Sequence, residues 1–126
     1  MKELSTDEAP PSIGPFSQGI EDGDRIYVSG QGPIDPETGD IVDGDVATQT
    51  ERTLENVDAV LRAGDRSLDD VVKATVFLQD MGDYDAVNEV YGSYMSEPYP
   101  ARSAVEVVEL PVDIAVEIEV VASTRG

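Results

Sequence analysis

The segment Asp70–Gln79, DVVKATVFLQ, has the sequence pattern of a β-strand, and the predicted fold is built around it. It is rich in β-branched residues and alternates with the two-residue period of a β-strand. The spacing predicts a strand with Val72, Ala74, Val76 and Leu78 on one face. The opposite face is mixed, since Val71 and Phe77 share it with Lys73 and Thr75.

A helix is expected on each side of this strand. Before it, Asp45 can cap a helix that runs to about Ala63, where Gly64 provides a C-terminal stop. After it, Asp83 opens a second helix that the segment 98–100, with two prolines, brings to an end. Apolar faces are expected at Val46, Thr50, Leu54, Val57, Val60 and Leu61 in the first helix, and at Tyr84, Val87, Tyr91, Tyr94 and Met95 in the second.

The remaining strands lie toward the two ends of the chain. Ser17–Glu21 and Arg25–Gly30 flank the turn pair Asp22-Gly23, which indicates a hairpin. Arg102–Glu109 and Ala115–Ala122 are two further strands. Other expected features are an extended arm around Pro10, Pro11, Gly14 and Pro15, a turn at Pro36–Asp40, a short strand at Ile41-Val42 and a break at Pro111. This order predicts an α+β fold, with a mixed sheet and two helices on one face, in a single domain over residues 1–126.

The last expected strand differs between its two faces. Its helix-facing residues are Val116, Ile118 and Val120, and its other face carries Ala115, Glu117, Glu119 and Val121. A face that mixes apolar and charged side chains is explained by a neighbouring subunit or by a wet outer face, as many antiparallel sheets have. The pattern favours a homo-oligomer, and the wet sheet is its alternative.

Negative charge dominates the composition. The chain has 27 acidic residues against 8 basic ones, a net charge of −19, and its only lysines are Lys2 and Lys73. Such a field repels nucleic acids and anionic membranes. Four explanations of this acidity compete: a salt-adapted cytosol, a basic protein partner, a nucleic-acid mimic and a bound cation cluster. Because the acids are spread from Glu3 to Glu119, salt adaptation is favoured.

Several kinds of site are excluded by residue types that the chain lacks. It has neither cysteine nor histidine, which removes thiol nucleophiles, Ser-His-Asp triads and His/Cys zinc sites. Asp35–Asp45 is not a calcium loop, because Gly39 stands where a third acid is needed. No run of about 18 apolar residues occurs, and Met1–Pro11 is too polar for a signal peptide. We therefore expect a cytoplasmic chain with no metal site.

Short motifs follow one another along the chain in the order of one known family. They are IGPFSQG at 13–19, VSGQ at 28–31, NV at 56–57, VKATVF at 72–77, VNEVY at 87–91, PARS at 100–103 and VEIE at 116–119. Together they span about Ala9 to Ala122, and on them the chain resembles the RidA family, also called the YjgF family.

The resemblance implies a fold, an assembly and an activity. Members of the family have a chorismate-mutase-like fold, with a mixed six-stranded sheet and two helices on one face. They form barrel-like homotrimers whose sites lie between subunits. They hydrolyse reactive 2-imino acids and enamines, such as 2-aminoacrylate, 2-iminopropanoate and 2-iminobutanoate, to 2-oxo acids and ammonia. The resemblance implies no cofactor, and its partners are the small imino acid and further copies of the chain.

Arg102 and Glu117 are the catalytic residues that the resemblance implies. A guanidinium can hold a carboxylate through two parallel hydrogen bonds, so Arg102 is expected to clamp the substrate. Glu117 would orient the attacking water and relay protons. Burial would raise its pKa, and a nearby Arg102 would lower it. The structural alternatives are a surface salt bridge for Arg102 and an outward carboxylate for Glu117, which fits Glu119 better.

The same resemblance places further residues at the substrate. Ser29, the Gly30 N–H, Asn88 and the Ala104 carbonyl would contact the substrate or the water, although Asn88 could equally join helix to strand. Phe16 stands where family members usually carry tyrosine, which removes one hydroxyl. Its ring would still favour small aliphatic imino acids.

Other functions compete with the deaminase. A non-catalytic trimer that binds small carboxylates, or a chaperone-like one, would keep Arg102 and dispense with Glu117. The net charge of −19 opposes a ribonuclease, and 8 basic residues are few for the dianionic substrate of a chorismate mutase.

Overall fold

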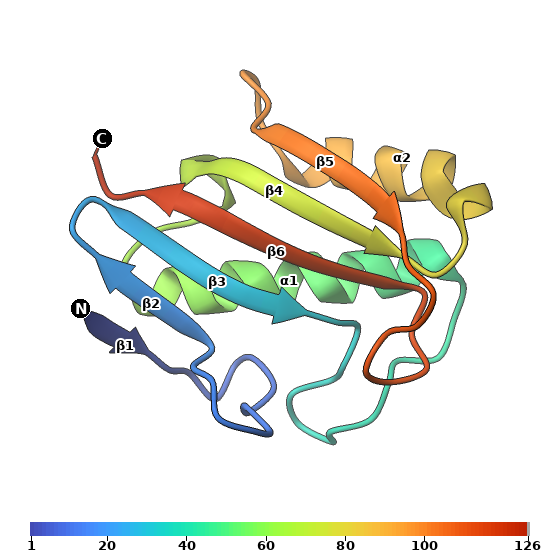
Figure 1. Ribbon diagram of the computed structural model, residues 1–126, viewed down its shortest axis with the longest axis horizontal. Helices are drawn as coiled ribbons and strands as arrows, with labels where there is room; N and C mark the ends of the chain where they lie inside the picture. Colours follow the sequence, from blue (N-terminus) through green and yellow to red (C-terminus); the bar gives the residue numbers. More distant parts are fainter. Residues whose placement is uncertain (126) are drawn as a thin grey trace.

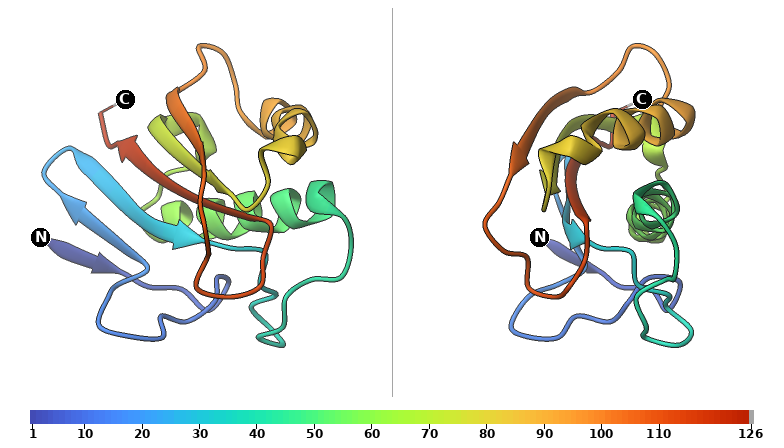
Figure 2. Two further views of the ribbon diagram at one scale, coloured as in Figure 1. Left: turned by 45° about the vertical axis from the view of Figure 1, so that its right-hand side comes forward. Right: turned by 90° about the vertical axis from the view of Figure 1, so that its right-hand side faces the viewer.

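Two helices lie on one face of a six-stranded sheet in the computed structural model, which describes residues 1–125 (Figure 1). The helices are α1 (Val46–Ala63) and α2 (Tyr84–Tyr94), and Figure 2 shows both on the same side of the sheet. The strands are β1 (Lys2–Leu4), β2 (Gly19–Asp22), β3 (Arg25–Gln31), β4 (Val71–Leu78), β5 (Ala101–Glu106) and β6 (Val116–Ser123). Their order is β1-β2-β3-β6-β4-β5, and only β4 and β5 are parallel. The predicted α+β fold is confirmed.

The strand predicted at Asp70–Gln79 is β4, and it lies inside the sheet between β6 and β5. Ala74, Val76 and Leu78 are buried as expected, but the prediction for Val72 was wrong. The register with β6 shifts between Val71 and Lys73, so Val71 is buried and Val72 is 43% exposed. A bulge of this kind inserts one residue and reverses the alternation on one side of it.

Helix α1 begins and ends where its sequence predicts. At the N-terminus the Asp45 carboxylate accepts a hydrogen bond from the Thr48 backbone N–H at 3.0 Å. At the C-terminus the Gly64 N–H donates a hydrogen bond to the Leu61 carbonyl. The predicted face packs into the core through Leu54, Val57, Val60 and Leu61.

Helix α2 begins differently from the expectation. Asp83 occupies the N-cap position, but its side chain makes no capping hydrogen bond. A 3-10 turn, Met81–Asp83, precedes the helix, and the Asp80 carboxylate caps that turn. Tyr84 lies at the exposed edge of the helix, so its assignment to the apolar face was wrong.

Three smaller expectations are also corrected. A strand that was not predicted, β1, precedes the expected arm and pairs with β2, and its Leu4 is buried in the core. Ile41 forms only an isolated bridge with Ile34 in place of a strand. The strand expected at 102–109 begins at Ala101 and ends at Glu106.

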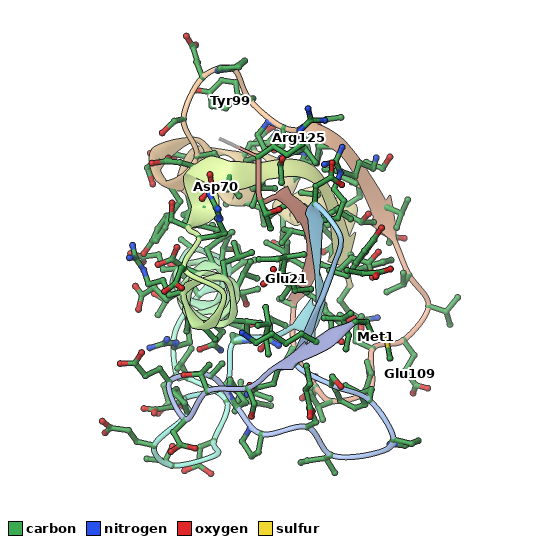
Figure 3. All side chains as sticks on the ribbon, turned by 90° about the vertical axis from the view of Figure 1, so that its left-hand side faces the viewer. Met1, Glu21, Asp70, Tyr99, Glu109 and Arg125 are labelled. Carbon is green, nitrogen blue, oxygen red and sulfur yellow. The ribbon has the colours of Figure 1, made fainter. Side chains whose placement is uncertain are left out.

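Charged side chains cover the periphery of the molecule. Figure 3 shows oxygen atoms spread around the outside, whereas mostly carbon fills the space between α1 and the sheet. Among residues 1–125 the ion pairs are Arg25–Asp24, Arg52–Glu55, Arg62–Asp58 and Arg125–Asp24. Most of the carboxylates therefore lack a cationic partner within the described chain.

We expect the melting temperature to rise with salt. Raising KCl from 0.1 to 1 M shortens the Debye length from ~10 to ~3 Å, which weakens repulsion between exposed carboxylates. Thermal unfolding followed by circular dichroism measures the effect. Sucrose at equal osmolality is the control, because it does not screen charge. A melting temperature that is equal at both salt concentrations would contradict salt adaptation and favour the basic-partner explanation.

Candidate functional site

Arg102 lies on the helix side of the sheet. In the parallel pair of β4 and β5, Arg102 lies opposite Ala74 and Ala104 lies opposite Val76, so their side chains share the face that α2 covers. The guanidinium Nη2 donates a hydrogen bond to the Tyr84 hydroxyl at 3.0 Å. Its central carbon also lies 4.8 Å from the ring centre of Tyr91, within the range of a cation–π contact.

No acidic side chain pairs with Arg102 among the described residues. Arg102 therefore does not form the surface salt bridge that was its structural alternative, at least to any described residue of this chain. In a protein with a net charge of −19, an unpaired guanidinium held by two tyrosines leaves its positive charge available to an anion.

Two hollows meet at Arg102. The first, of about 610 Å³, is lined by Met81, Gly82, Tyr84, Asp85, Arg102 and Ala104. The second, of about 310 Å³, is lined by Asn88, Tyr91, Gly92, Tyr99, Pro100 and Arg102. The predicted residues Asn88 and Ala104 thus lie beside Arg102.

Three polar groups of α2 surround the guanidinium. The Asn88 side chain and Arg102 lower the pKa of Tyr84. Burial raises the pKa of Tyr91, and the positive charge of Arg102 opposes that effect. The Asn88 Oδ1 and the Tyr91 hydroxyl are buried and have no hydrogen-bond partner among residues 1–125. Buried groups of this kind usually bond water or a ligand. We call Arg102, Tyr84, Asn88, Tyr91 and Ala104 the arginine half-site.

Glu117 lies on the open face of the sheet. It is opposite Phe77 in β4, and its neighbours Val116 and Ile118 point the other way, into the core. Partial burial and the charge of Glu119 raise the pKa of Glu117. A carboxyl group whose pKa is raised toward neutrality is suited to exchange protons.

Gly30 provides the space in which the Glu117 carboxylate lies. A Cβ at Gly30 would come within 2.5 Å of Glu117 Oε2 and 2.8 Å of its carboxyl carbon. Gly30 lies where the register of β3 and β6 shifts, between Val28 and Gln31. We call Glu117 and Gly30 the glutamate half-site.

The Gly30→Ala variant tests this arrangement. The added methyl must displace the Glu117 carboxylate, so we expect roughly a 10-fold or greater loss of turnover in a chain that still folds. Steady-state kinetics and a melting curve measure the two effects. Gly23→Ala is a control for the methyl group itself, because a Cβ there meets no atom within 4 Å, although its backbone φ of +61° carries a strain cost. Normal turnover in Gly30→Ala would mean that Glu117 needs no fixed position.

Phe16 belongs to the segment before β2, and Ser29 lies in β3 beside that segment. The Ser29 hydroxyl donates to the Ser17 carbonyl at 2.6 Å, so it holds that segment against β3. Phe16 is 51% exposed and therefore lies outside the core. No described contact joins Phe16 or Ser29 to Arg102 or Glu117.

The two half-sites lie on opposite faces of one sheet. Side chains alternate along a strand, and the register of β5, β4 and β6 places Arg102 on the helix side and Glu117 on the open side. One small ligand cannot reach both groups within a single chain. The predicted pair of catalytic residues is thus not brought together by this chain alone.

Sequence reasoning missed how α2 surrounds Arg102. Tyr84, Asn88 and Tyr91 have the spacing i, i+4 and i+7, which places them on one face of a helix. Both tyrosines were predicted on the apolar face, which is right for the buried Tyr91 and wrong for the exposed Tyr84. Only the tertiary structure shows that both contact Arg102.

A clustered metal site and a membrane-spanning helix are both absent from residues 1–125. These residues contain no group of three or more carboxylates arranged to hold a metal ion. No helix among them is both long and apolar enough to cross a membrane.

Known proteins resemble this chain along nearly its whole length. The family model described as Endoribonuclease L-PSP matches residues 6–124. A RutC family protein of Pyrococcus horikoshii is 52% identical, over 97% of this chain and 98% of that protein. The 2-iminobutanoate/2-iminopropanoate deaminase of Escherichia coli K12 is 43% identical over 98% of both. The crystal structure of Escherichia coli TdcF with bound serine superposes with a TM-score of 0.92, at 41% identity over 98% of both chains. The match of fold, motifs and length shows that this chain belongs to the YjgF/RidA family.

Proposed function

We propose that this protein is a cytoplasmic 2-iminobutanoate/2-iminopropanoate deaminase that hydrolyses reactive imino acids and enamines to 2-oxo acids and ammonia. The observation that carries the proposal is the unpaired Arg102 guanidinium, held between Tyr84 and Tyr91 beside a hollow. This arrangement suits a small carboxylate. The names of relatives at 42–43% identity and the serine in TdcF, which also carries a carboxylate, support it.

We infer that the active form is a homotrimer with its sites between subunits. The arginine half-site of one copy would face the glutamate half-site of the next, which accounts for their separation in one chain. The open sheet face supports this, because it mixes Glu117 with the half-exposed Tyr27 and Val105. β5 is also an edge strand, whose outer side pairs with no described strand.

The chemistry follows from the charges of the two half-sites. Arg102 would hold the carboxylate, with Asn88 close by. Glu117 would accept a proton from water as the oxygen bonds to C2 of the imine and would return it to the nitrogen. The proton of the new C2 hydroxyl would then pass through Glu117 to the nitrogen as the C2–N bond breaks and the C2=O bond forms, so ammonia leaves and the 2-oxo acid remains. An enamine must first take up a proton at C3 and lose one from its nitrogen to become the imine.

The remaining expected residues have supporting roles in this proposal. Ser29, the Gly30 N–H and the Ala104 carbonyl would contact the substrate or the water. Phe16 would form an apolar wall that favours small aliphatic imino acids. We do not propose RNA cleavage, because the charge of −19 opposes RNA binding.

The test generates 2-aminoacrylate or 2-iminobutanoate in situ from serine or threonine with a salt-tolerant dehydratase. We expect the protein, in molar KCl, to raise the rate of 2-oxo acid release above the spontaneous rate in proportion to its concentration. Heat-inactivated protein is the control. Binding of 2-oxobutanoate without any acceleration would favour the non-catalytic carboxylate-binding trimer.

A further inference from the structure

We propose that Tyr84 is a positioning residue for the carboxylate clamp: its hydroxyl holds the Arg102 guanidinium in the orientation that receives the substrate. The inference rests on the proposed function, because it requires Arg102 to bind a carboxylate. It assigns a role to a residue that the sequence placed on an apolar helix face.

Two contacts restrain the guanidinium in complementary ways. The cation–π contact with the Tyr91 ring, with 4.8 Å between the central carbon and the ring centre, restrains the position of the group. The 3.0 Å hydrogen bond from Nη2 to the Tyr84 hydroxyl limits its rotation. A guanidinium carries five N–H donors, so the others stay available for a carboxylate. Ordering the side chain before binding lowers the entropy lost when the ligand binds.

A neutral partner orients Arg102 without cancelling its charge. A carboxylate in the place of Tyr84 would fix the guanidinium equally well, but it would compete with the ligand for the same positive charge. Asp85 lines the same hollow, yet it forms no ion pair with Arg102 among the described residues. In so acidic a chain, a neutral phenol at position 84 leaves the positive charge of Arg102 available to the substrate carboxylate.

The Tyr84 hydroxyl can also lose its proton, and that would convert it into the competing anion. The charged groups that line its hollow are Arg102 of β5 and Asp85 of α2. The hydrogen bond from Asn88 and the charge of Arg102 lower the pKa of Tyr84, whereas burial and, after it, the charge of Asp85 raise it. Below this pKa the phenol is neutral, and Arg102 can bind a carboxylate. Above it a phenolate neutralises Arg102, so affinity for a carboxylate falls.

The experiment compares Tyr84→Phe with Tyr94→Phe. The Tyr84 variant keeps the ring and loses the hydroxyl. Tyr94 is a matched control on the same helix, since its hydroxyl bonds Glu55 and its pKa is raised to about 12. Calorimetric titration with 2-oxobutanoate, which has no group that titrates between pH 7 and 10.5, measures affinity in molar KCl.

We expect Tyr84→Phe to weaken 2-oxobutanoate binding about 5-fold at pH 7 and to raise KM similarly, with kcat changed less than about twofold. Tyr94→Phe should match the wild type. The wild-type affinity should fall at alkaline pH, and this fall should be absent in Tyr84→Phe.

Two results would overturn the inference. They are wild-type affinity in Tyr84→Phe and an alkaline fall in affinity that persists in that variant. If Arg102→Lys still loses binding, these results leave the proposed function standing. Unchanged binding in Arg102→Lys would instead mean that Arg102 does not bind the carboxylate, and it would contradict both the proposed function and this inference.

Discussion

Arg102→Lys is expected to lower kcat/KM for 2-iminobutanoate about 100-fold, because two hydrogen bonds to a carboxylate become one. An ammonium presents no planar fork of donors, cannot donate to the carboxylate and to Tyr84 in the same geometry, and lacks the planar group that lies over the Tyr91 ring. Steady-state kinetics with imine generated in situ measures the loss.

The fold should survive this change, because Arg102 is half-buried at an edge strand and outside the core. Arg62→Lys is the matched control, since Arg62 is exposed on α1 and pairs only with Asp58. Near-normal turnover in Arg102→Lys, with a normal melting temperature, would remove Arg102 from the catalytic site.

Glu117→Gln is expected to reduce kcat by roughly 10²–10⁴-fold and to leave 2-oxobutanoate binding nearly intact. The amide keeps the size of the side chain but cannot accept the proton from water. Kinetics and calorimetric titration of the same preparation separate the two effects. Equal losses of binding and turnover would indicate a structural role.

Stability provides a second test of the same residue. Because burial raises the pKa of Glu117, the folded chain favours its protonated form, and this contribution to stability is lost as pH rises through the raised pKa. At neutral pH the ionised carboxylate therefore costs stability. Glu117→Gln should leave the melting temperature at pH 7 unchanged or higher, whereas a structural carboxylate would lower it when replaced.

Glu119→Gln is the control on the same strand. Glu119 is exposed and raises the pKa of Glu117 by charge repulsion. Its replacement should lower that pKa and move the acidic limb of the rate profile to lower pH, with little change in the maximal rate. An unmoved acidic limb would mean that Glu117 does not control it.

Local patterns determined most of the secondary structure from the sequence. The period of two in β4 and β6, the Asp45 cap and the Gly64 stop of α1 each depend on residues a few positions apart. Such features are encoded in short segments, so the α+β class, the apolar face of β6 and most of the apolar face of β4 could be predicted. The ordered motifs likewise indicated the family and its candidate residues.

Positions that depend on distant pairing could not be predicted in this way. The bulge beside Val72 arises from the register between β4 and β6, and it reversed the expected faces of Val71 and Val72. Tyr84 was predicted on the core face, but its hydroxyl accepts a hydrogen bond at the sheet edge from Arg102, 18 positions later.

The sequence by itself determined the charge, the helices and strands, and the residue types from which a site can be built. Only the tertiary structure decided that Arg102 and Glu117 lie on opposite faces of the sheet. The physical reason is that the face of a side chain in β5 is set by its pairing with β4, a strand about 28 residues earlier. A shift of one residue in that register would have placed Arg102 on the same face as Glu117.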